Sequence, residues 1–343
     1  MTGARRTKKS ATDATDAPVD KSRKGRTKKT VDSNVSETLE TNPKLQEQPE
    51  VYNFSGSRTL NRPVISEPAD NNNVVNNFKE YVPDENHLLE MRTVAGNTFK
   101  NLLDTLKTVL NDANIVFTEK GLKLASVDTN KHALVHLFME ANSFEFYHCK
   151  QKLVLGIDIE SLHRTIKTNK LNDLMCFIVR KDNPGYLEVS FENCLKGTRV
   201  SDQIKLLSLR EYNIFDKIEY ILPPEMDSQS FQNICREMAS FGANLLEIKS
   251  IGDKLIFSNL DGNTRRQVVV RVGNGDESST SAKPDASGVF LLRFLKSFAK
   301  AASLSPRVRI YLKNESPLIC EYSVAGLGTL KYVLSCEEPD VAE

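Results

Sequence analysis

The sequence predicts an α+β fold made of two tandem domains that repeat one pattern, in which two helices alternate with short antiparallel strands. Apolar residues recur at helical spacing in four segments, and runs that alternate apolar and polar residues separate these segments. A shift of 132 residues lays the apolar faces of the first two helices over those of the last two. Together these observations indicate an internal duplication.

The 343 residues carry 46 Lys and Arg against 45 Asp and Glu, and this net charge of +1 is unevenly distributed. Residues 1–30 have a net charge of +7, residues 31–90 of −7 and residues 91–343 of +1. Residues 1–88 are also poor in apolar side chains, so burial cannot offset the entropy lost on ordering. We therefore expect a disordered, charged tail over residues 1–88, followed by a globular body.

The tail contains two basic clusters, at residues 5–9 and 21–29. Three interpretations stay open for them: a nuclear-import signal, a nonspecific DNA tether, and a solvated run of charge. The Asn-rich residues 71–77 are typical of a linker.

The first domain is expected to contain helices at residues 97–112 and 158–167. The first helix would bury Phe99, Leu102, Leu103, Leu106, Val109 and Leu110, and the second Ile159, Leu162 and Ile166. Alternating runs predict strands at residues 115–118, 122–127, 133–140, 174–180, 186–191 and 200–207.

The second domain repeats these features. The third helix would bury Phe231, Ile234, Cys235 and Met238, and the fourth Leu291, Phe294 and Phe298. Strands are expected at residues 245–250 and 254–258. The predicted boundaries are a tail over 1–88, a first domain over 89–207, a connector over 208–222, a second domain over 223–336 and a C-terminal tail over 337–343.

The sequence lacks the patterns that accompany catalysis, metal binding or membrane insertion. The six cysteines form no Cys-x-x-Cys pair, so we expect reduced, mostly buried thiols. No segment reaches the roughly 18 apolar residues of a membrane span. There is no P-loop, nucleophile elbow or HExxH helix, and His87, His132, His136, His148 and His163 pair with no nucleophile. We predict a protein that is not an enzyme, with no catalytic or metal-ligating residues and no cofactor.

Bases gather on the polar sides of all four predicted helices, with few acids among them, namely Asp104, Glu160 and Glu237. Such a surface suits a phosphate backbone, although ordinary solvated helix faces explain it equally well on composition alone.

The body resembles the proliferating cell nuclear antigen family, the trimeric sliding clamps of DNA replication. The resemblance rests on an ordered set of stretches within about residues 91–336, none of which is decisive alone. They are residues 102–113, 121–128, 144–149, 156–167, 200–202, 231–236, 294–301, 317–322 and 330–332. The first 90 residues have no counterpart in the usual form of the family.

The resemblance implies two tandem DNA-clamp domains with antiparallel sheets outside and two helices of each domain inside, in a ring of three chains joined head to tail. Edge strands at about residues 198–206 and 264–272 would form the contact between subunits. The interface residues that it implies are Val200, Asp202, Gln203, Ile204, Arg266, Val268 and Val270.

The resemblance also implies that the helices line the channel and hold phosphates without reading base sequence. Asn101 and Asn233 stand where family members often have a base, which suggests a weaker grip that Lys296 or Lys170 compensates. The implied channel residues are Lys100, Lys107, Arg164, Lys167, Lys170, Arg236, Arg293, Lys296 and Lys300.

A third implication is an apolar pocket beneath the connector, which accepts short client peptides with an aromatic plug. The matching residues are Val127, Lys131, Leu134, Leu209, Tyr212, Ile214, Phe215, Pro317, Val333 and Leu334. Val333 replaces a common aromatic residue and Cys336 a proline, so client preference is expected to differ. In the tail, Gln48, Val51 and Phe54 are spaced loosely like such a peptide, which is a weak match.

We therefore expect a DNA sliding clamp, or DNA polymerase processivity factor, that encircles duplex DNA and tethers replication and repair enzymes. The expected partners are duplex DNA, two further copies in a homotrimer, and DNA polymerase, clamp loader, ligase and nuclease, with no membrane. Two alternatives remain: a checkpoint-type subunit of a hetero-oligomeric ring, because Gln203 stands at an often aromatic interface position, and a DNA-modifying enzyme with an unrecognised site. The expected location is the nucleus or another replication compartment, such as a viral cytoplasmic factory.

Overall fold

The computed structural model describes residues 82–168, 173–193, 195–210, 223–261, 264–272 and 285–337. The predictions for residues 1–81, including the basic clusters and the peptide-like Gln48 segment, lie outside this part of the chain, as do most of the connector and the C-terminal tail from residue 338. The first strand begins at His87, two residues before the predicted start of the first domain.

The first domain contains nine strands, two α-helices and one 3-10 helix among its described residues. In chain order they are β1 (His87–Thr93), α2 (Gly96–Leu106), β2 (Asp112–Thr118), β3 (Gly121–Val127), β4 (Ala133–Glu140), η1 (Ala141–Ser143), β5 (Phe146–Cys149), β6 (Leu153–Asp158), α3 (Ile159–Lys167), β7 (Leu174–Arg180), β8 (Tyr186–Asn193) and β9 (Thr198–Lys205).

Apart from β5 and η1, which have no counterpart among the described residues, the second domain follows the same order, which confirms the predicted α+β repeat. Its elements are β10 (Glu225–Asp227), α4 (Ser228–Ser240), β11 (Leu245–Ile251), β12 (Lys254–Asn259), β13 (Gln267–Arg271), β14 (Ala286–Leu291), α5 (Leu292–Phe298), η2 (Ala299–Ser303), β15 (Arg307–Tyr311), β16 (Leu318–Ser323) and β17 (Gly328–Leu334). β4 thus corresponds to β13, and β9 corresponds to β17.

The strands form three antiparallel sheets. One has five strands in the order β5-β1-β7-β8-β9, and one has four in the order β13-β12-β11-β14. The third has eight strands, β10-β15-β16-β17-β4-β3-β2-β6, and belongs to both domains, because β17 pairs with β4 from Gly328 opposite Met139 to Leu334 opposite Ala133. β9 and β13 stand at the ends of the two smaller sheets.

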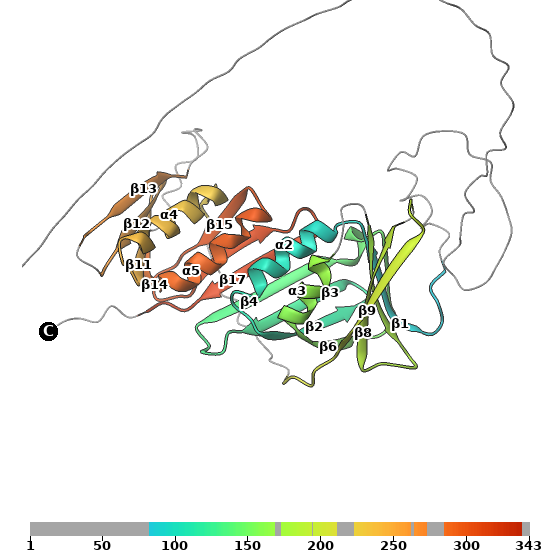
Figure 1. Ribbon diagram of the computed structural model, residues 1–343. Coiled ribbons are helices and arrows are strands. Elements are labelled where there is room, and N and C mark those ends of the chain that lie inside the picture. The colour runs from blue at the N-terminus through green and yellow to red at the C-terminus, as the bar shows by residue number, and fades with distance from the viewer. Residues whose placement is uncertain are drawn as a thin grey trace, which may run out of the picture. The chain divides into compact units, whose positions relative to one another are not determined.

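The four α-helices lie along one side of the sheets, in the order α4, α5, α2, α3 (Figure 1). α2 contacts α3 and η2, and α4 contacts α5 and η2, so the helices of the two domains meet. Their apolar sides belong to one hydrophobic core cluster that spans both domains and includes Phe99, Leu162, Phe231 and Phe298. Burial of these sides leaves the polar sides of the helices facing outward.

The first helix is shorter than predicted. α2 ends at Leu106, whereas the periodicity of Val109 and Leu110 extended it to residue 112. Leu110 is buried just after the turn at residues 107–109, and β2 then begins at Asp112, which pairs with Asp158 of β6. Ile159 N donates to Asn111 O at 2.9 Å, so sheet pairing takes over the backbone groups that a longer helix would use.

Five cysteines are described and none forms a disulfide; Cys149, Cys176, Cys235 and Cys320 are buried and Cys336 is half-buried. Among the described residues, no helix is long and apolar enough to cross a membrane.

Candidate nucleic-acid and partner interfaces

Seven of the nine predicted channel bases lie on the described helices, Lys107 directly follows α2, and Lys170 lies outside the described residues. Lys100 of α2 and Lys107 are half-buried. The other six are exposed on α3, α4, α5 and η2: Arg164, Lys167, Arg236, Arg293, Lys296 and Lys300.

One helix in each domain, α3 in the first and α4 in the second, begins at an aspartate that caps its N-terminus. Asp158 caps α3 by accepting from Ser161 N at 2.6 Å, and Asp227 caps α4 by accepting from Ser230 N at 2.6 Å. Helix ends held in this way fix which residues of each turn face outward. The bases therefore sit on helices whose rotation about their axes is set by caps and by the core.

Two of the three acids near these bases are already paired. Asp104 Oδ1 lies 3.2 Å from Lys107 Nζ and 2.8 Å from His163 Nε2. Glu237 Oε2 accepts from Arg266 Nη2 at 2.6 Å, and the Arg266 guanidinium also lies 4.8 Å from the centre of the Phe241 ring. Pairing removes much of the negative charge that these acids would present to an approaching phosphate.

His163 is a site residue that the sequence reasoning missed. Its imidazole is buried between α2 and α3, with Lys107 Nζ 3.3 Å from Nδ1. The helical spacing of His163 did not reveal this role, because His163 meets Asp104 only when α2 and α3 are adjacent. That adjacency is a tertiary contact and cannot be read from either helix alone.

On the eight-stranded sheet, the face opposite the helices carries an apolar row that crosses five strands. The register places Val127 opposite Leu134, Leu134 opposite Val333, Val333 opposite Ile319, and Ile319 opposite Tyr311. All five side chains are half-buried. The predicted pocket residues Val127, Leu134 and Val333 are thus brought together, and Ile319 and Tyr311 extend the row.

The other predicted pocket residues do not belong to this apolar row. Leu334 is fully buried in the core, because it follows Val333 on the same strand and points to the opposite face. Pro317 is half-buried just before β16, and Lys131 is exposed in the turn between β3 and β4. Tyr212, Ile214 and Phe215 lie outside the described residues.

A polar row runs beside the apolar one, and its charges are paired. Glu321 accepts from Arg309 at 3.0 Å and from the Tyr311 hydroxyl at 3.0 Å, and its carboxylate lies 2.8 Å from Lys331 Nζ. Burial alone would raise the pKa of Glu321, but the contacts with Lys331, Tyr311 and Arg309 outweigh it and hold the pKa below its usual value. Next in the row, burial and the charges of Lys123 and Lys331 lower the pKa of His136.

The first residues of the connector are held at the same sheet. Leu207 N donates to Gly156 O at 2.8 Å, and Asn114 Nδ2 donates to Arg210 O at 3.1 Å. A Cβ on Gly156 would lie 2.2 Å from Leu207 O and 3.1 Å from Leu209 Cγ. Only a glycine therefore lets the connector, with the predicted pocket residue Leu209, approach β6 this closely.

The predicted interface residues lie on or next to the end strands β9 and β13. On β9, Val200 and Gln203 are exposed, Asp202 is half-buried and Ile204 is buried. On β13, Val268 and Val270 pack against the core, whereas Val269, which was not predicted, is 52% exposed. Arg266 precedes β13 and is held by Glu237.

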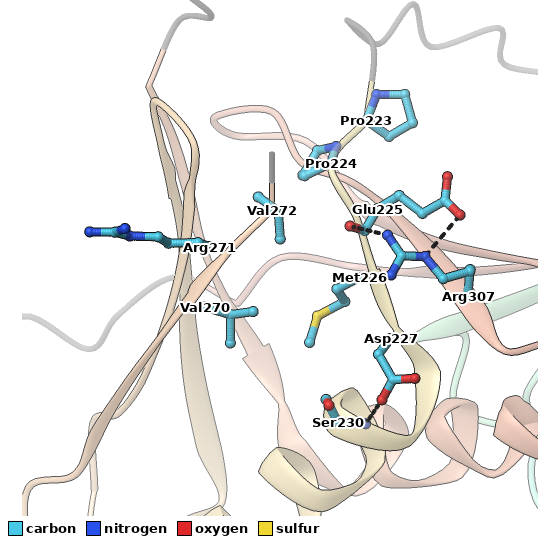
Figure 2. A pocket seen from close by; sticks show the side chains of 10 residues that line it. All are labelled: Pro223, Pro224, Glu225, Met226, Asp227, Ser230, Val270, Arg271, Val272 and Arg307. Atoms are coloured by element: carbon cyan, nitrogen blue, oxygen red, sulfur yellow. Dashed lines mark hydrogen bonds and ion pairs between the residues drawn. The ribbon is translucent and has the colours of Figure 1, made fainter. Parts of the chain in front are cut away.

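A pocket of about 740 Å³ opens at the start of α4, between β10 and the end of β13 (Figure 2). Figure 2 shows Arg307 turned toward Glu225, where Nε donates to Glu225 Oε1 at 3.2 Å, and Asp227 turned toward Ser230. Val270 is the one predicted site residue in its lining. Across the described ranges, no group of three or more His, Cys, Asp or Glu side chains is arranged to hold a metal ion.

Comparison with known proteins decides the family. The models of the proliferating cell nuclear antigen N-terminal and C-terminal domains match residues 88–213 and 215–337. The probable DNA polymerase sliding clamp 1 of Paramecium bursaria Chlorella virus 1 is 31% identical over 258 residues, which are 74% of this chain and 98% of that protein. The chain belongs to the proliferating cell nuclear antigen family.

A second relative in this family is proliferating cell nuclear antigen 2 of Drosophila melanogaster, which is 29% identical over 257 residues, 74% of this chain and 100% of that protein. Both relatives are matched over nearly their whole length by about three quarters of this chain. The family models leave residues 1–87 unmatched. These residues are an addition to the proliferating cell nuclear antigen body.

Proposed function

We propose that this chain performs the sliding-clamp function of its family as a ring of three copies, with duplex DNA inside the ring and client enzymes on its outer face. The observation that carries the proposal is the duplicated strand junction. β17 and β4 pair inside the chain, and their repeats, β9 and β13, are left at the two ends of the smaller sheets.

Head-to-tail pairing of β9 with β13 of a second copy would reproduce the internal junction. The register supports this, because Leu318 opposite Leu334 corresponds to Leu187 opposite Ile204. By the same correspondence, Tyr332 of β17 occupies the position in the second domain that Asp202 of β9 occupies in the first. A contact that uses two different surfaces closes into a ring when its rotation divides a full turn, and the internal junction sets that rotation.

When the register of the internal β17–β4 pair is applied to β9 and β13 of two copies, the residues that face each other are chemically compatible. Leu137 of β4 is equivalent to Val268 of β13, since Leu124 opposite Leu137 corresponds to Phe257 opposite Val268. Val135, two residues before Leu137, is then equivalent to Arg266. The internal pair of Tyr332 and Val135 becomes Asp202 opposite Arg266, and the pair of Leu330 and Leu137 becomes Val200 opposite Val268. An opposite-charge pair and an apolar pair favour self-association over like-charge repulsion.

The helix surface supports the inside of the ring as the DNA side. Six exposed bases on α3, α4, α5 and η2 offer contacts to phosphate that carry no sequence information. Such contacts release counterions when they form and are exchanged at little cost, so the bound ring moves along the duplex. The protein would act by tethering, because a client held near its template rebinds before it escapes.

Client binding is proposed on the apolar row of the eight-stranded sheet, next to the docked start of the connector. The row offers a half-buried apolar surface flanked by a polar row in which Glu321 is paired with Arg309 and Lys331, which suits a short peptide with apolar anchors. We place DNA polymerase, ligase, nuclease and clamp loader there as a class, and a homotrimer rather than a hetero-oligomeric ring as the assembly.

The ring predicts topological retention on DNA. The purified chain is loaded on nicked circular DNA and on the same DNA after linearisation, and the bound fraction is followed by gel filtration in high salt. Retention on the circle and loss from the linear form are expected. Equal loss from both forms would contradict encirclement.

The channel surface is tested with the same assay and with binding to short duplexes. Arg236→Ala, Lys296→Ala and Lys300→Ala together should reduce the slope of log affinity against log salt by about 2 to 3, as one phosphate contact contributes about 0.9. Lys313→Ala, an exposed base in the loop between β15 and β16, is the matched control and should leave the slope unchanged. A slope unaltered by the triple substitution would place the DNA elsewhere.

A further inference from the structure

His163 is a buried histidine on a helix whose other charged side chains are exposed. Its exposed fraction is 4%, whereas Glu160, Arg164 and Lys167 of α3 are exposed. The shift of 132 residues that relates the two domains places Leu295 of α5 at the equivalent position, and Leu295 is fully buried. An ionisable ring thus replaces an apolar side chain on the inward side of α3, and a buried polar group needs partners.

Asp104 and Lys107 meet the His163 ring. The ring atom Nε2 lies 2.8 Å from Asp104 Oδ1. Lys107 Nζ lies 3.3 Å from the ring atom Nδ1 and 3.4 Å from Nε2. Asp104 Oδ1 and Lys107 Nζ are themselves 3.2 Å apart. The three side chains therefore form a closed cluster at the contact of α2 with α3.

Other charged residues lie on the elements packed against α3, which are α2, β2, β6 and β9. Within the part of the chain that the structure describes, none of them forms an ion pair or hydrogen bond with the His163 ring. They are Lys100 of α2, Asp112 of β2, Asp158 of β6, and Arg199, Asp202 and Lys205 of β9. The charge of the ring therefore acts on Asp104 and Lys107 before any other group.

Lys107 lies over the face of the His163 ring. Its Nζ is almost equally far from both ring nitrogens, and in the ring plane that position is taken by the Cε1–H group between them. The ammonium is therefore above the plane, where it is attracted to a neutral ring and repelled by a charged one. The contact with Asp104 places the proton of the neutral ring on Nε2, because a carboxylate accepts and does not donate.

These contacts hold Lys107 back from solvent. Its side chain is 31% exposed. A phosphate that binds Lys107 has to replace both the carboxylate of Asp104 and the face of the ring. Protonation of His163 weakens both contacts, because the imidazolium repels the ammonium and takes a larger share of the Asp104 charge.

We propose that His163 is a positioning residue for DNA binding, whose neutral ring holds Lys107 and whose protonation releases Lys107 for phosphate. The part that concerns DNA rests on the proposed function, in which Lys107 faces the duplex. A histidine changes its charge between about pH 5 and pH 8, so the chain should bind duplex DNA more firmly at the acid end of this range. Leu295 does not titrate, so the effect belongs to the first domain.

The release of Lys107 can be measured without DNA. The natural chain is treated with a limiting amount of an acetylating reagent at pH 8 and at pH 6, and acetylation is quantified by peptide mass spectrometry. Lys107 is compared with Lys313, an exposed base between β15 and β16, which cancels the general loss of lysine reactivity at the lower pH. The ratio should rise about threefold or more at pH 6. A constant or falling ratio would overturn the proposal.

His163→Gln tests the charge of the ring in DNA binding. Glutamine keeps an amide donor for Asp104 and does not titrate in this range. Fluorescence anisotropy with a short duplex gives the slope of log affinity against log salt at both pH values. The natural chain should steepen by about 0.9 at pH 6, which is one phosphate contact, and His163→Gln should keep the same slope at both. His148→Gln on β5, at a half-buried histidine, is the matched control and should steepen like the natural chain. Equal steepening in His163→Gln would overturn the proposal.

Lys107→Ala separates positioning from a direct attraction between the imidazolium and phosphate. A ring that acts through Lys107 has no effect once Lys107 is absent, so the slope should be the same at both pH values. Steepening by about 0.9 in Lys107→Ala would overturn the positioning role, because the ring would then attract phosphate itself.

The two measurements distinguish this inference from the proposed function. A slope unaltered by the triple substitution of Arg236, Lys296 and Lys300 would contradict the proposed DNA channel, whereas the acetylation ratio would still test the release of Lys107. A pH-independent slope in the natural chain, together with a reduced slope in the triple variant, would overturn this inference alone. The acetylation ratio of the natural chain also decides the matter if His163→Gln does not fold.

Discussion

His163 Nε2 lies 2.8 Å from Asp104 Oδ1, and this contact joins α3 to α2 at the base of the basic helix surface. The same carboxylate lies 3.2 Å from Lys107 Nζ, whose side chain is 31% exposed. Asp104 therefore shares its charge between an internal partner and a base that we place in the DNA channel. A phosphate that binds Lys107 has to compete with Asp104.

We expect Asp104→Asn to strengthen DNA binding. The substitution removes one negative charge from the helix surface and releases Lys107 for phosphate, so the salt slope should steepen by about 0.9 and the affinity at low salt should rise about twofold to tenfold. Fluorescence anisotropy with a short duplex, repeated over a salt series, measures both. Glu315→Gln, an exposed acid in the turn before β16, makes the same charge change and should have no effect. Weaker binding by Asp104→Asn would show that the carboxylate mainly orients Lys107.

We expect Asp202→Arg to prevent self-association. In the transferred register the new base meets Arg266 of the next copy, and like charges placed opposite each other at an interface cost several kcal/mol. Light scattering should then give the 38.5 kDa of one chain, against three times that mass for the natural protein. Asp253→Arg, in the exposed turn between β11 and β12, is the control for charge alone. A trimer that survives Asp202→Arg argues against this register.

Gly156→Ala should weaken client-peptide binding through the connector. The new Cβ would lie 2.2 Å from Leu207 O, so the connector has to move away from β6 and from the apolar row. We expect a stability loss of about 1–3 kcal/mol, measured by urea unfolding. Affinity for a peptide with an aromatic plug should fall by about threefold to tenfold, measured by calorimetry.

The control for this change is Gly185→Ala, at a glycine whose added Cβ would meet nothing within 4 Å. Its effect on either measurement should be small. If both alanine variants bind the peptide like the natural protein, the docked start of the connector has no part in the client site.

Glu321→Gln should reduce the amount by which the free energy of unfolding falls at acid pH. The pKa of Glu321 lies below its usual 4.5 in the folded chain, so the stability that its ionised form contributes is complete above pH 4.5 and is lost as the pH falls through the lowered value. The variant should therefore lose about 1–3 kcal/mol at pH 7 and show a smaller further loss between pH 5 and pH 3. Urea unfolding at several pH values measures this, with Glu119→Gln in the exposed turn after β2 as the control. Parallel stability curves for the variant and the natural chain would contradict the assignment.

Much of the fold and part of the candidate site could be predicted from the sequence. Helical periodicity placed Phe99, Leu162, Phe231 and Phe298 correctly in the core, and the same periodicity put the bases on the polar sides of the helices. These properties depend on neighbours three and four residues apart, which the sequence records directly. The shift of 132 residues also predicted that the second domain repeats the first.

Other features depend on partners far away in the chain, and the sequence alone did not reach them. Val333 and Leu334 are adjacent apolar residues, yet one lies on the outer face and the other in the core, because the pairing of β17 with β4 sets the alternation. The end of α2 was misplaced for a similar reason, since pairing of Asp112 with Asp158 ends the helical segment.

The sequence by itself determined the repeat, the elements and the side of each helix that is buried, because local spacing decides which side chains share a face. Only the tertiary structure decided that His163 meets Asp104, that five strands from two domains align one apolar row, and that β9 and β13 stand at the ends of the two smaller sheets. These are matters of register and packing between distant segments, where a shift of one residue turns every side chain to the opposite face.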